Sequence, residues 1–332
     1  MKSHKIDYYY RLVIFSVFIL LSIWLLFQIR QLLVILFISV IFMSALKPSV
    51  EKLTKYRISR AFAIGILYFF IILLFGFVTG VIAPPIVEQS NVLVSRLPDY
   101  LKLLESYNIG PDVIVGQIGK LGYLPANLIN FIIGVFGNIV EIIFTAIVTF
   151  YLLMERENLN KYLVFVIGDA RAERAESIIV EIENKLGGWV RAEVALMFIL
   201  GLMAYFGLSI LHVEYALPLA ILAGLMEVIP NIGPVISAIP AVSVGLLISP
   251  ITGLAVVALF VLIHQLENTL IVPQVMSKEV GVDPLLTILS LDIGFQIGGI
   301  AGAVLALPTL LVIQILFKEF GSVYTSRTPN SP

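Results

Sequence analysis

Two carboxyl side chains stand alone in long apolar stretches of this chain. Glu227 is the only charged residue within positions 215–263, and Asp292 is the only one within positions 284–317. A charge at the centre of a lipid bilayer costs at least about 2.5–3.5 kcal/mol, so such residues usually bind ions, protons or substrates. Either carboxyl could instead stay protonated and form local hydrogen bonds, which would still suit a proton carrier.

The same two stretches are related by an internal repeat. An offset of 65 residues superposes Glu227 on Asp292, Asn231 on Gln296, and Gly233 on Gly298. The shared pattern is acid-x3-amide-Ile-Gly-x4-Ala-x2-Ala. Residues that break helices puncture both stretches, and they are Pro230, Gly233, Pro234, Pro240, Gly298 and Gly299. The repeat therefore predicts two broken helices of related design.

We expect each punctured stretch to form a re-entrant helical hairpin, which dips into the membrane and returns to the same side. A continuous helix precedes each hairpin, at 192–211 and at 251–272, and the two helices start on opposite sides. Such an inverted repeat is typical of secondary transporters. Backbone groups freed at the breaks must face protein or water, because lipid cannot hydrogen bond to them. The alternative interpretation is that Gly and Ala only permit close helix packing.

A third polar group lies on the helix between the two hairpins. His264 is three residues before Glu267 and four before Asn268, so all three side chains share one helix face. His264 could be a ligand, but pairing with the neighbouring carboxylate is its simpler state. The side chains predicted to line a substrate or ion site are Glu227, Asn231, Glu267, Asn268, Asp292 and Gln296. If the ion is Na⁺, Glu227 and Asp292 are its expected ligands.

The composition requires an integral membrane protein. Of the 332 residues, 59% are hydrophobic and 13% are charged, and this charged fraction is about half that of a soluble domain. The net charge of −1 gives no basic surface for nucleic acid. The chain has no cysteine and three histidines, and it carries no GxSxG, HExxH, P-loop or dinucleotide motif. We therefore expect neither an enzyme nor a bound cofactor.

We predict an all-α polytopic membrane protein with about six full spans in addition to the two hairpins. The six runs are Leu12–Ile29, Leu32–Leu46, Ala61–Ala83, Phe131–Met154, Ala192–Leu211 and Ile251–Val272. Up to position 191, Lys and Arg number fourteen on the side of the N-terminus and four on the other side. Positive residues collect on the cytoplasmic side, so both termini are predicted to be cytoplasmic.

This topology divides the chain into six segments. They are N-terminal scaffold spans (1–83), an extracytoplasmic amphipathic segment (84–130), a further span (131–154), cytoplasmic amphipathic helices (155–191), an inverted-repeat transport core (192–317) and a cytoplasmic tail (318–332). We expect one or both hairpins to move relative to the scaffold and so to alternate the access of the site.

Several sequence motifs lie at or near the predicted breaks. They are the run from Glu227 to Pro234 (EVIPNIGP) with Ile239-Pro240-Ala241, the pair Glu267-Asn268 followed by Pro273, Gly281 and Pro284, and the stretch from Gly298-Gly299 to Pro308. Lys47-Pro48 and Leu97-Pro98 add two further matches. Together these motifs resemble the AI-2E family, the autoinducer-2 exporter family of bacterial membrane proteins, over nearly the whole chain.

The resemblance implies a transporter of the bacterial cytoplasmic membrane that forms a homo-oligomer. Some members export the furanone autoinducer-2, and others exchange Na⁺ or Li⁺ for H⁺. Asp292 departs from the family pattern, in which many members have an apolar or small residue, and a second acid favours cation or proton coupling. Two other interpretations stay open. One is a passive channel, and the other is a non-transporting assembly or stress protein organised by segments 84–130 and 155–191.

Overall fold

The computed structural model describes residues 3–77, the single positions 80, 84 and 88, and residues 139–230, 233–276 and 283–325. Every regular element in these ranges is a helix, which confirms the predicted all-α class. The helices are α1 (Ser3–Gln28), α2 (Arg30–Lys55), α3 (Arg60–Phe77), α7 (Ile139–Glu155), η2 (Arg156–Asn158), α8 (Leu159–Ile167), α9 (Asp169–Ile210), α10 (Ala216–Met226), α11 (Gly233–Ile248), α12 (Pro250–Leu266), η3 (Glu267–Ile271), α13 (Val272–Met276) and α14 (Pro284–Thr325).

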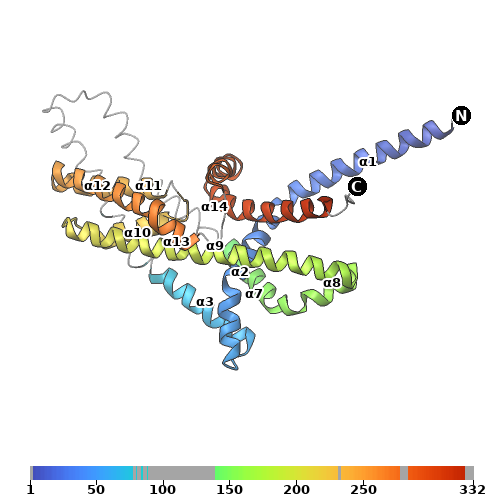
Figure 1. The fold of residues 1–332 in the computed structure, drawn as a ribbon, viewed down its shortest axis with the longest axis horizontal. Coiled ribbons are helices and arrows are strands. Elements are labelled where there is room, and N and C mark those ends of the chain that lie inside the picture. Colours follow the sequence, from blue (N-terminus) through green and yellow to red (C-terminus); the bar gives the residue numbers. More distant parts are fainter. Residues whose placement is uncertain are drawn as a thin grey trace, which may run out of the picture.

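Helix α9 runs along the centre of the molecule. One half packs against α2 and α8, and the other half packs against α10, α12 and α13 (Figure 1). Its 42 residues contain no proline, and Gly187 is buried against the backbone of Ser44 in α2. The segment boundary predicted between positions 191 and 192 falls inside this continuous helix. Helix α9 continues past the predicted membrane surface because other helices pack against both of its halves.

The main hydrophobic core lies between α9, α10, α11 and α12. Its buried members are Leu200, Ala204, Leu208, Val213, Leu219, Ala220, Ala223, Ala241, Val244, Val256, Phe260 and Ile263. Several are alanines, and small residues let helices approach closely without depending on the exclusion of water. This core forms the apolar surroundings of the site described below.

Large apolar side chains cover much of the outer surface of the helices. Phe198 and Phe206 on α9 and Leu254 on α12 are examples. Within the described residues, four helices have the length and apolar composition needed to cross a membrane, namely Arg30–Lys55, Asp169–Ile210, Pro250–Val275 and Leu285–Glu319. These features identify an integral membrane protein.

The predicted spans correspond to helices of two kinds. The spans at 32–46 and 251–272 lie within two of the four long helices, and the span at 192–211 ends one residue after a third, Asp169–Ile210. The spans at 12–29, 61–83 and 131–154 overlap α1, α3 and α7 where their residues are described. Apart from positions 84 and 88, the extracytoplasmic segment 84–130 lies outside the described residues, as do 131–138 and the end of the tail.

The first predicted break separates α10 from α11, and these two helices pack against each other. A side chain at Gly233 would collide with the backbone carbonyl of Met226, so the chain can turn this tightly only with glycine at that position. Pro230 lies in the same turn, and Pro240 lies inside α11. Asn231 lies outside the described residues.

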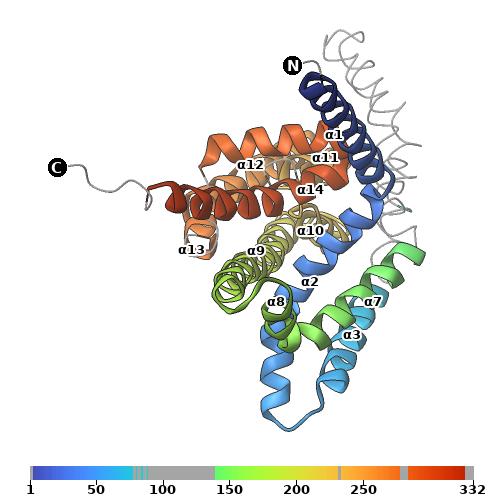
Figure 2. The same cartoon turned by 90° about the vertical axis from the view of Figure 1, so that its right-hand side faces the viewer.

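The second predicted break bends α14 sharply into two arms. Gly298 and Gly299 have non-helical backbone angles, and Gly299 has φ of 59°. A Cβ atom on Gly294 would collide with the backbone of Gly302. Gly294 and Gly302 would be about 12 Å apart in a straight helix. Their close approach therefore requires the two arms of α14 to fold back and to cross at Gly294 and Gly302. Helix α14 packs against α9 (Figure 2).

Candidate functional site

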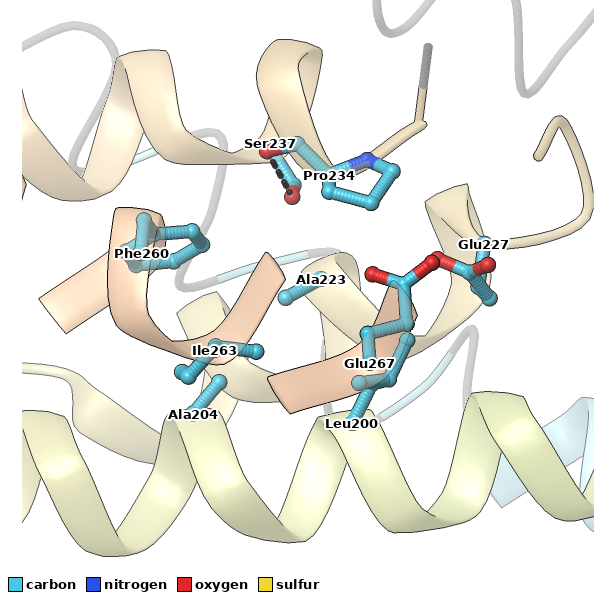
Figure 3. Close-up of a pocket in the computed structure, with 9 residues that line it drawn as sticks. All are labelled: Leu200, Ala204, Ala223, Glu227, Pro234, Ser237, Phe260, Ile263 and Glu267. Atoms are coloured by element: carbon cyan, nitrogen blue, oxygen red, sulfur yellow. Dashed lines mark hydrogen bonds between the residues drawn. The ribbon is translucent and has the colours of Figure 1, made fainter. Parts of the chain in front are cut away.

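A small pocket lies where the four core helices meet. Its lining comes from α9, from the end of α10, from the start of α11 and from α12 with η3, and comprises Leu200, Ala204, Ala223, Glu227, Pro234, Ser237, Phe260, Ile263 and Glu267 (Figure 3). The cavity has a volume of about 10 Å³, which is close to the smallest space that admits one water molecule. In this conformation the pocket therefore accommodates a species of the size of water or a small ion.

Two predicted site residues, Glu227 and Glu267, face each other in this pocket. Their exposed fractions are 1% and 2%, and their carboxyl groups point toward one another (Figure 3). Two ionised carboxylates that face each other in an apolar pocket repel, and one proton between them removes that repulsion. The pair is therefore arranged to hold one proton between two acidic oxygens.

Interrupted helical backbone positions both carboxyls. Glu227 is the first residue after α10, and its backbone N–H still donates to the carbonyl of Gly224 at 3.3 Å. Glu267 begins η3, a π-helical turn that follows α12 directly. Wide π-helical turns inside α-helices occur often at functional sites. Each acid thus lies at the point where a regular helix ends, which turns its side chain toward the core.

The remaining polar group of the pocket is already satisfied. Ser237 donates a hydrogen bond from its hydroxyl to the carbonyl of Pro234 at 3.0 Å. Among the described residues, by contrast, one carboxyl oxygen of Glu227, Oε2, is buried without a hydrogen-bond partner. Among the described polar groups of the pocket, the one without a hydrogen-bond partner is therefore a carboxyl oxygen of Glu227.

A third buried carboxyl, Glu193 on α9, was missed by the sequence analysis. It is 3% exposed, and within the described part of the chain neither of its oxygens has a hydrogen-bond partner. It interacts electrostatically with both Glu267 and Glu227. Glu193 is the second residue of the predicted span 192–211 and lies two residues after Arg191. The available signal was an acid followed by a long apolar run.

The predicted group on α12 and η3 is also formed. His264 Nδ1 lies 3.2 Å from Glu267 Oε2, and the amide nitrogen of Asn268 lies 3.1 Å from His264 Nε2 and 3.5 Å from Nδ1. Glu267 is buried, His264 is half-buried and Asn268 is exposed. The three side chains therefore run from the pocket to the surface of the helix.

The structure does not bring Asp292 and Gln296 into this pocket. Both side chains are exposed, and Gln296 donates a hydrogen bond to Asp292 at 2.8 Å. The expected joint site, with Na⁺ between Glu227 and Asp292, is thus not assembled here. The physical reason is the bend at Gly298 and Gly299, which folds the first arm of α14 onto the second and leaves its acidic face outside.

A second cluster of buried charge, which we call the ion-pair cluster, lies on the other half of α9. Glu183 receives hydrogen bonds from Arg156 and from Lys47, the latter at 2.8 Å, and Arg156 also pairs with Glu176 at 2.9 Å. Burial alone would lower the pKa of Arg156, but its hydrogen bonds to Glu183 and Glu176 raise that pKa above its ordinary value. The cluster fastens α2 and η2 to α9.

These features define a class of protein, a helical membrane transporter with a small acidic pocket between interrupted helices. The family model described as AI-2E family transporter matches residues 12–321. The chain belongs to the AI-2E family, as its motifs suggested.

Named relatives match over most of their length. The putative transport protein YueF of Bacillus subtilis is 27% identical over 290 residues, which cover 81% of this chain and 79% of the relative. The AI-2 transport protein TqsA of Escherichia coli is 26% identical over 300 residues, which cover 86% and 83%. The putative transport protein YtvI of Bacillus subtilis is 27% identical over 318 residues, which cover 83% and 85%.

Proposed function

We propose that this protein is a secondary transporter of the AI-2E type in which the Glu227–Glu267 pair binds the coupling proton. The observation that carries the proposal is the burial of two facing carboxyls in a pocket that accommodates one small species. A carboxyl pair in apolar surroundings can exchange its proton for a monovalent cation without a large change in the charge of the site. We therefore propose exchange of Na⁺ or Li⁺ for H⁺ across the cytoplasmic membrane.

Movement of the two broken helices would alternate access to the pocket, and an inverted repeat would supply them. The breaks at Gly233 and Gly298 are 65 residues apart. Helix α12 runs opposite to the second half of α9, since Gly207 faces Leu259 while Leu200 lies with Glu267 at the pocket. Each of these helices precedes one broken unit. This arrangement supports, as a proposal, two re-entrant hairpins of opposite orientation.

The decisive test is transport by purified protein in proteoliposomes that contain a pH-sensitive dye. Addition of Na⁺ or Li⁺ to one side should move protons to that side. The substitutions Glu227→Gln and Glu267→Gln should each lower this exchange at least about tenfold, because the amide cannot release a proton. Glu51→Gln, which alters an exposed carboxylate on α2, is the matched control. Normal exchange in both pocket variants would refute the assignment.

Asp292 enters the proposal as a separate polar group on the outside of the bend in α14. In a conformation other than this one, movement of the first arm could bring it toward the pocket. Asp292→Asn tests this in the same assay. Loss of exchange in Asp292→Asn would indicate that Asp292 takes part in the transport cycle together with the buried pair. Unchanged exchange would restrict proton coupling to Glu227 and Glu267.

Export of an autoinducer-2-like solute is the second candidate function, and the printed name of TqsA supports it. The pocket volume of about 10 Å³ is too small for a furanone, so such a solute would require a wider conformation. Efflux of autoinducer-2 from loaded vesicles, measured beside cation exchange, separates the two candidates. A passive channel would instead conduct without proton coupling, and an assembly protein would give no flux.

The proposal includes the membrane topology. The excess of Lys and Arg on one side, fourteen against four up to position 191, supports cytoplasmic termini in a bacterial cytoplasmic membrane. By family resemblance we also propose a homo-oligomer. Labelling of single-cysteine variants at each end of the chain, in intact cells and in opened ones, tests the orientation.

A further inference from the structure

The helix that carries Glu267 presents a polar face at a depth where lipid is expected. This face, which we call the α12 polar face, consists of His264, Gln265, Asn268 and Thr269. Gln265, Asn268 and Thr269 are all exposed. Apolar neighbours on the same membrane-length helix are exposed as well, with Val261 at 64% and Leu262 at 56%.

Hydrogen bonds within the α12 polar face satisfy only part of its polar capacity. Gln265 donates to the Thr269 hydroxyl at 3.1 Å, and Asn268 donates to the carbonyl of His264 at 3.1 Å. The remaining amide and carbonyl groups are exposed, and hydrocarbon cannot hydrogen bond to them. Polar side chains at such depth face water-filled cavities or protein interiors. The face is therefore suited to line an aqueous opening.

His264 connects this face to the buried acids. Its ring nitrogen lies 3.2 Å from Glu267, and the exposed side-chain fraction falls from 36% at His264 to 3% at Glu267. The Asn268 amide nitrogen lies 3.1 Å from Nε2 and 3.5 Å from Nδ1. A proton path through the ring to Glu267 starts from the tautomer whose ring proton is on Nδ1, the nitrogen that faces Glu267. Among the described residues, the ionisable groups that interact with Glu267 are His264, Glu227 and Glu193.

We propose that His264 relays protons between an aqueous opening over the α12 polar face and the Glu267–Glu227 pair. A hydronium ion in the opening gives a proton to Nε2, while the Nδ1 proton passes to a carboxylate oxygen of Glu267. One O–H bond of the hydronium breaks as one N–H bond forms at Nε2, and one N–H bond at Nδ1 breaks as one O–H bond forms on Glu267. Rotation of the ring restores its starting arrangement. Imidazole suits this step because it gains and loses protons readily near neutral pH.

The first experiment tests the opening and does not depend on transport. The chain has no cysteine, so single variants can be labelled without background. Gln265→Cys and Thr269→Cys should react with a charged thiol reagent that cannot cross membranes, added to either side of proteoliposomes. Val261→Cys and Leu262→Cys lie about one turn before Gln265 on the same exposed side of the helix. If the opening is limited to the polar residues, these two variants should react at least about tenfold more slowly, because a thiolate does not form in lipid. Equal, slow reaction at all four positions would overturn the opening.

The second experiment tests the relay, which rests on the proposed function. His264→Gln keeps an amide within reach of Glu267 but cannot pass a proton. We expect an exchange rate about tenfold lower, and a flattened dependence of the remaining rate on pH between about pH 5 and pH 8. His264→Ala should regain rate when imidazole is added, which a merely structural role would not produce.

The outcomes separate the two proposals. A wild-type rate and pH profile in His264→Gln, together with inactive Glu267→Gln, would refute the relay and leave proton coupling intact. Active Glu267→Gln would refute the relay, and normal exchange in Glu227→Gln as well would refute the proposed function, while thiol labelling at Thr269 would still report whether the opening exists.

Discussion

Glu183 and Glu193 lie ten residues apart on α9 and each is only 3% exposed, yet their surroundings are opposite. Glu183 pairs with Lys47 and Arg156. Glu193 has no hydrogen-bond partner among the described residues, and the groups that act on it electrostatically include a second acid, Glu267. One helix therefore carries a neutralised acid and an unneutralised acid about 15 Å apart.

The difference separates an architectural role from a chemical one. A buried ion pair whose partners are all present keeps its charge fixed, and it ties together the helices that contribute to it. A buried carboxyl without a counter-charge costs free energy when ionised, so its proton is the part that can change. The ion-pair cluster thus holds the fold, and the group of Glu193, Glu227 and Glu267 is the part suited to function.

The largest expected effect comes from removing one partner of the ion-pair cluster. Arg156→Met leaves Glu183 and Glu176 buried with less positive charge, and we expect a loss of about 3–5 kcal/mol in the free energy of unfolding. Arg171→Met, at an exposed position of α9, is the control and should change stability by less than about 0.5 kcal/mol. Unfolding in detergent, followed by tryptophan fluorescence, measures both.

A double variant sharpens this prediction. Arg156→Met combined with Glu183→Leu removes the two most buried charges of the cluster and leaves Lys47 and Glu176, which are partly exposed, without these partners. Stability should recover part of the loss, because an apolar pair can replace a buried ion pair. If the double variant is as unstable as the sum of the two single variants, burial of an unpaired charge is not the cause.

Neutralising the two acids of α9 should give an intermediate and unequal effect. Glu183→Gln weakens two charged hydrogen bonds and should lower stability by about 1.5–3 kcal/mol. Glu193→Gln removes a carboxyl that has no cationic partner, so stability should be equal to the wild type or higher. Thermal unfolding of the two variants in parallel measures the contrast. Equal destabilisation by both would show that Glu193 is also paired.

The smallest expected effect concerns Glu155, an exposed acid that lies directly after a predicted span. Hydrogen bonds from Tyr162, at 2.6 Å, and from Asn158 hold the pKa of Glu155 below its ordinary value. A lowered folded-state pKa gives stabilisation that is present above the unfolded pKa of about 4.3 and is lost as the pH falls through the folded value.

Tyr162→Phe removes the main donor to Glu155. We therefore expect a small decrease in Tm at about pH 6 that shrinks as the pH falls below about 4.3, because protonation of the carboxyl removes the stabilisation. A Tm series over this pH range measures it. A decrease that stays constant with pH would instead indicate lost packing of the ring.

The positions of the breaks and one part of the site were predictable from sequence. Glycine and proline at 230–234 and at 298–299 are local signals, since they act on the backbone wherever the chain places them. The His264, Glu267 and Asn268 group was predictable because helical spacing alone puts these residues on one face. Glu227 was recognisable as a lone acid in an apolar run.

Other features depended on which surfaces meet. From the symmetry of the repeat, Asp292 was the expected partner of Glu227. In the structure Glu267 faces Glu227 in the pocket, and Asp292 accepts a hydrogen bond from Gln296. Glu193 is the second residue of a predicted span and follows Arg191 closely, and this position gives no local sign of its burial. That burial depends on helices from other parts of the chain that pack on α9, among them α10, α12, α13 and α14.

The sequence by itself determined the helical membrane class, the family and the positions of the backbone breaks, because composition, motifs and local backbone geometry can be read from the residues alone. Tertiary structure decided which acids share a pocket and which acquire a counter-charge, because those outcomes depend on contacts between helices distant in sequence.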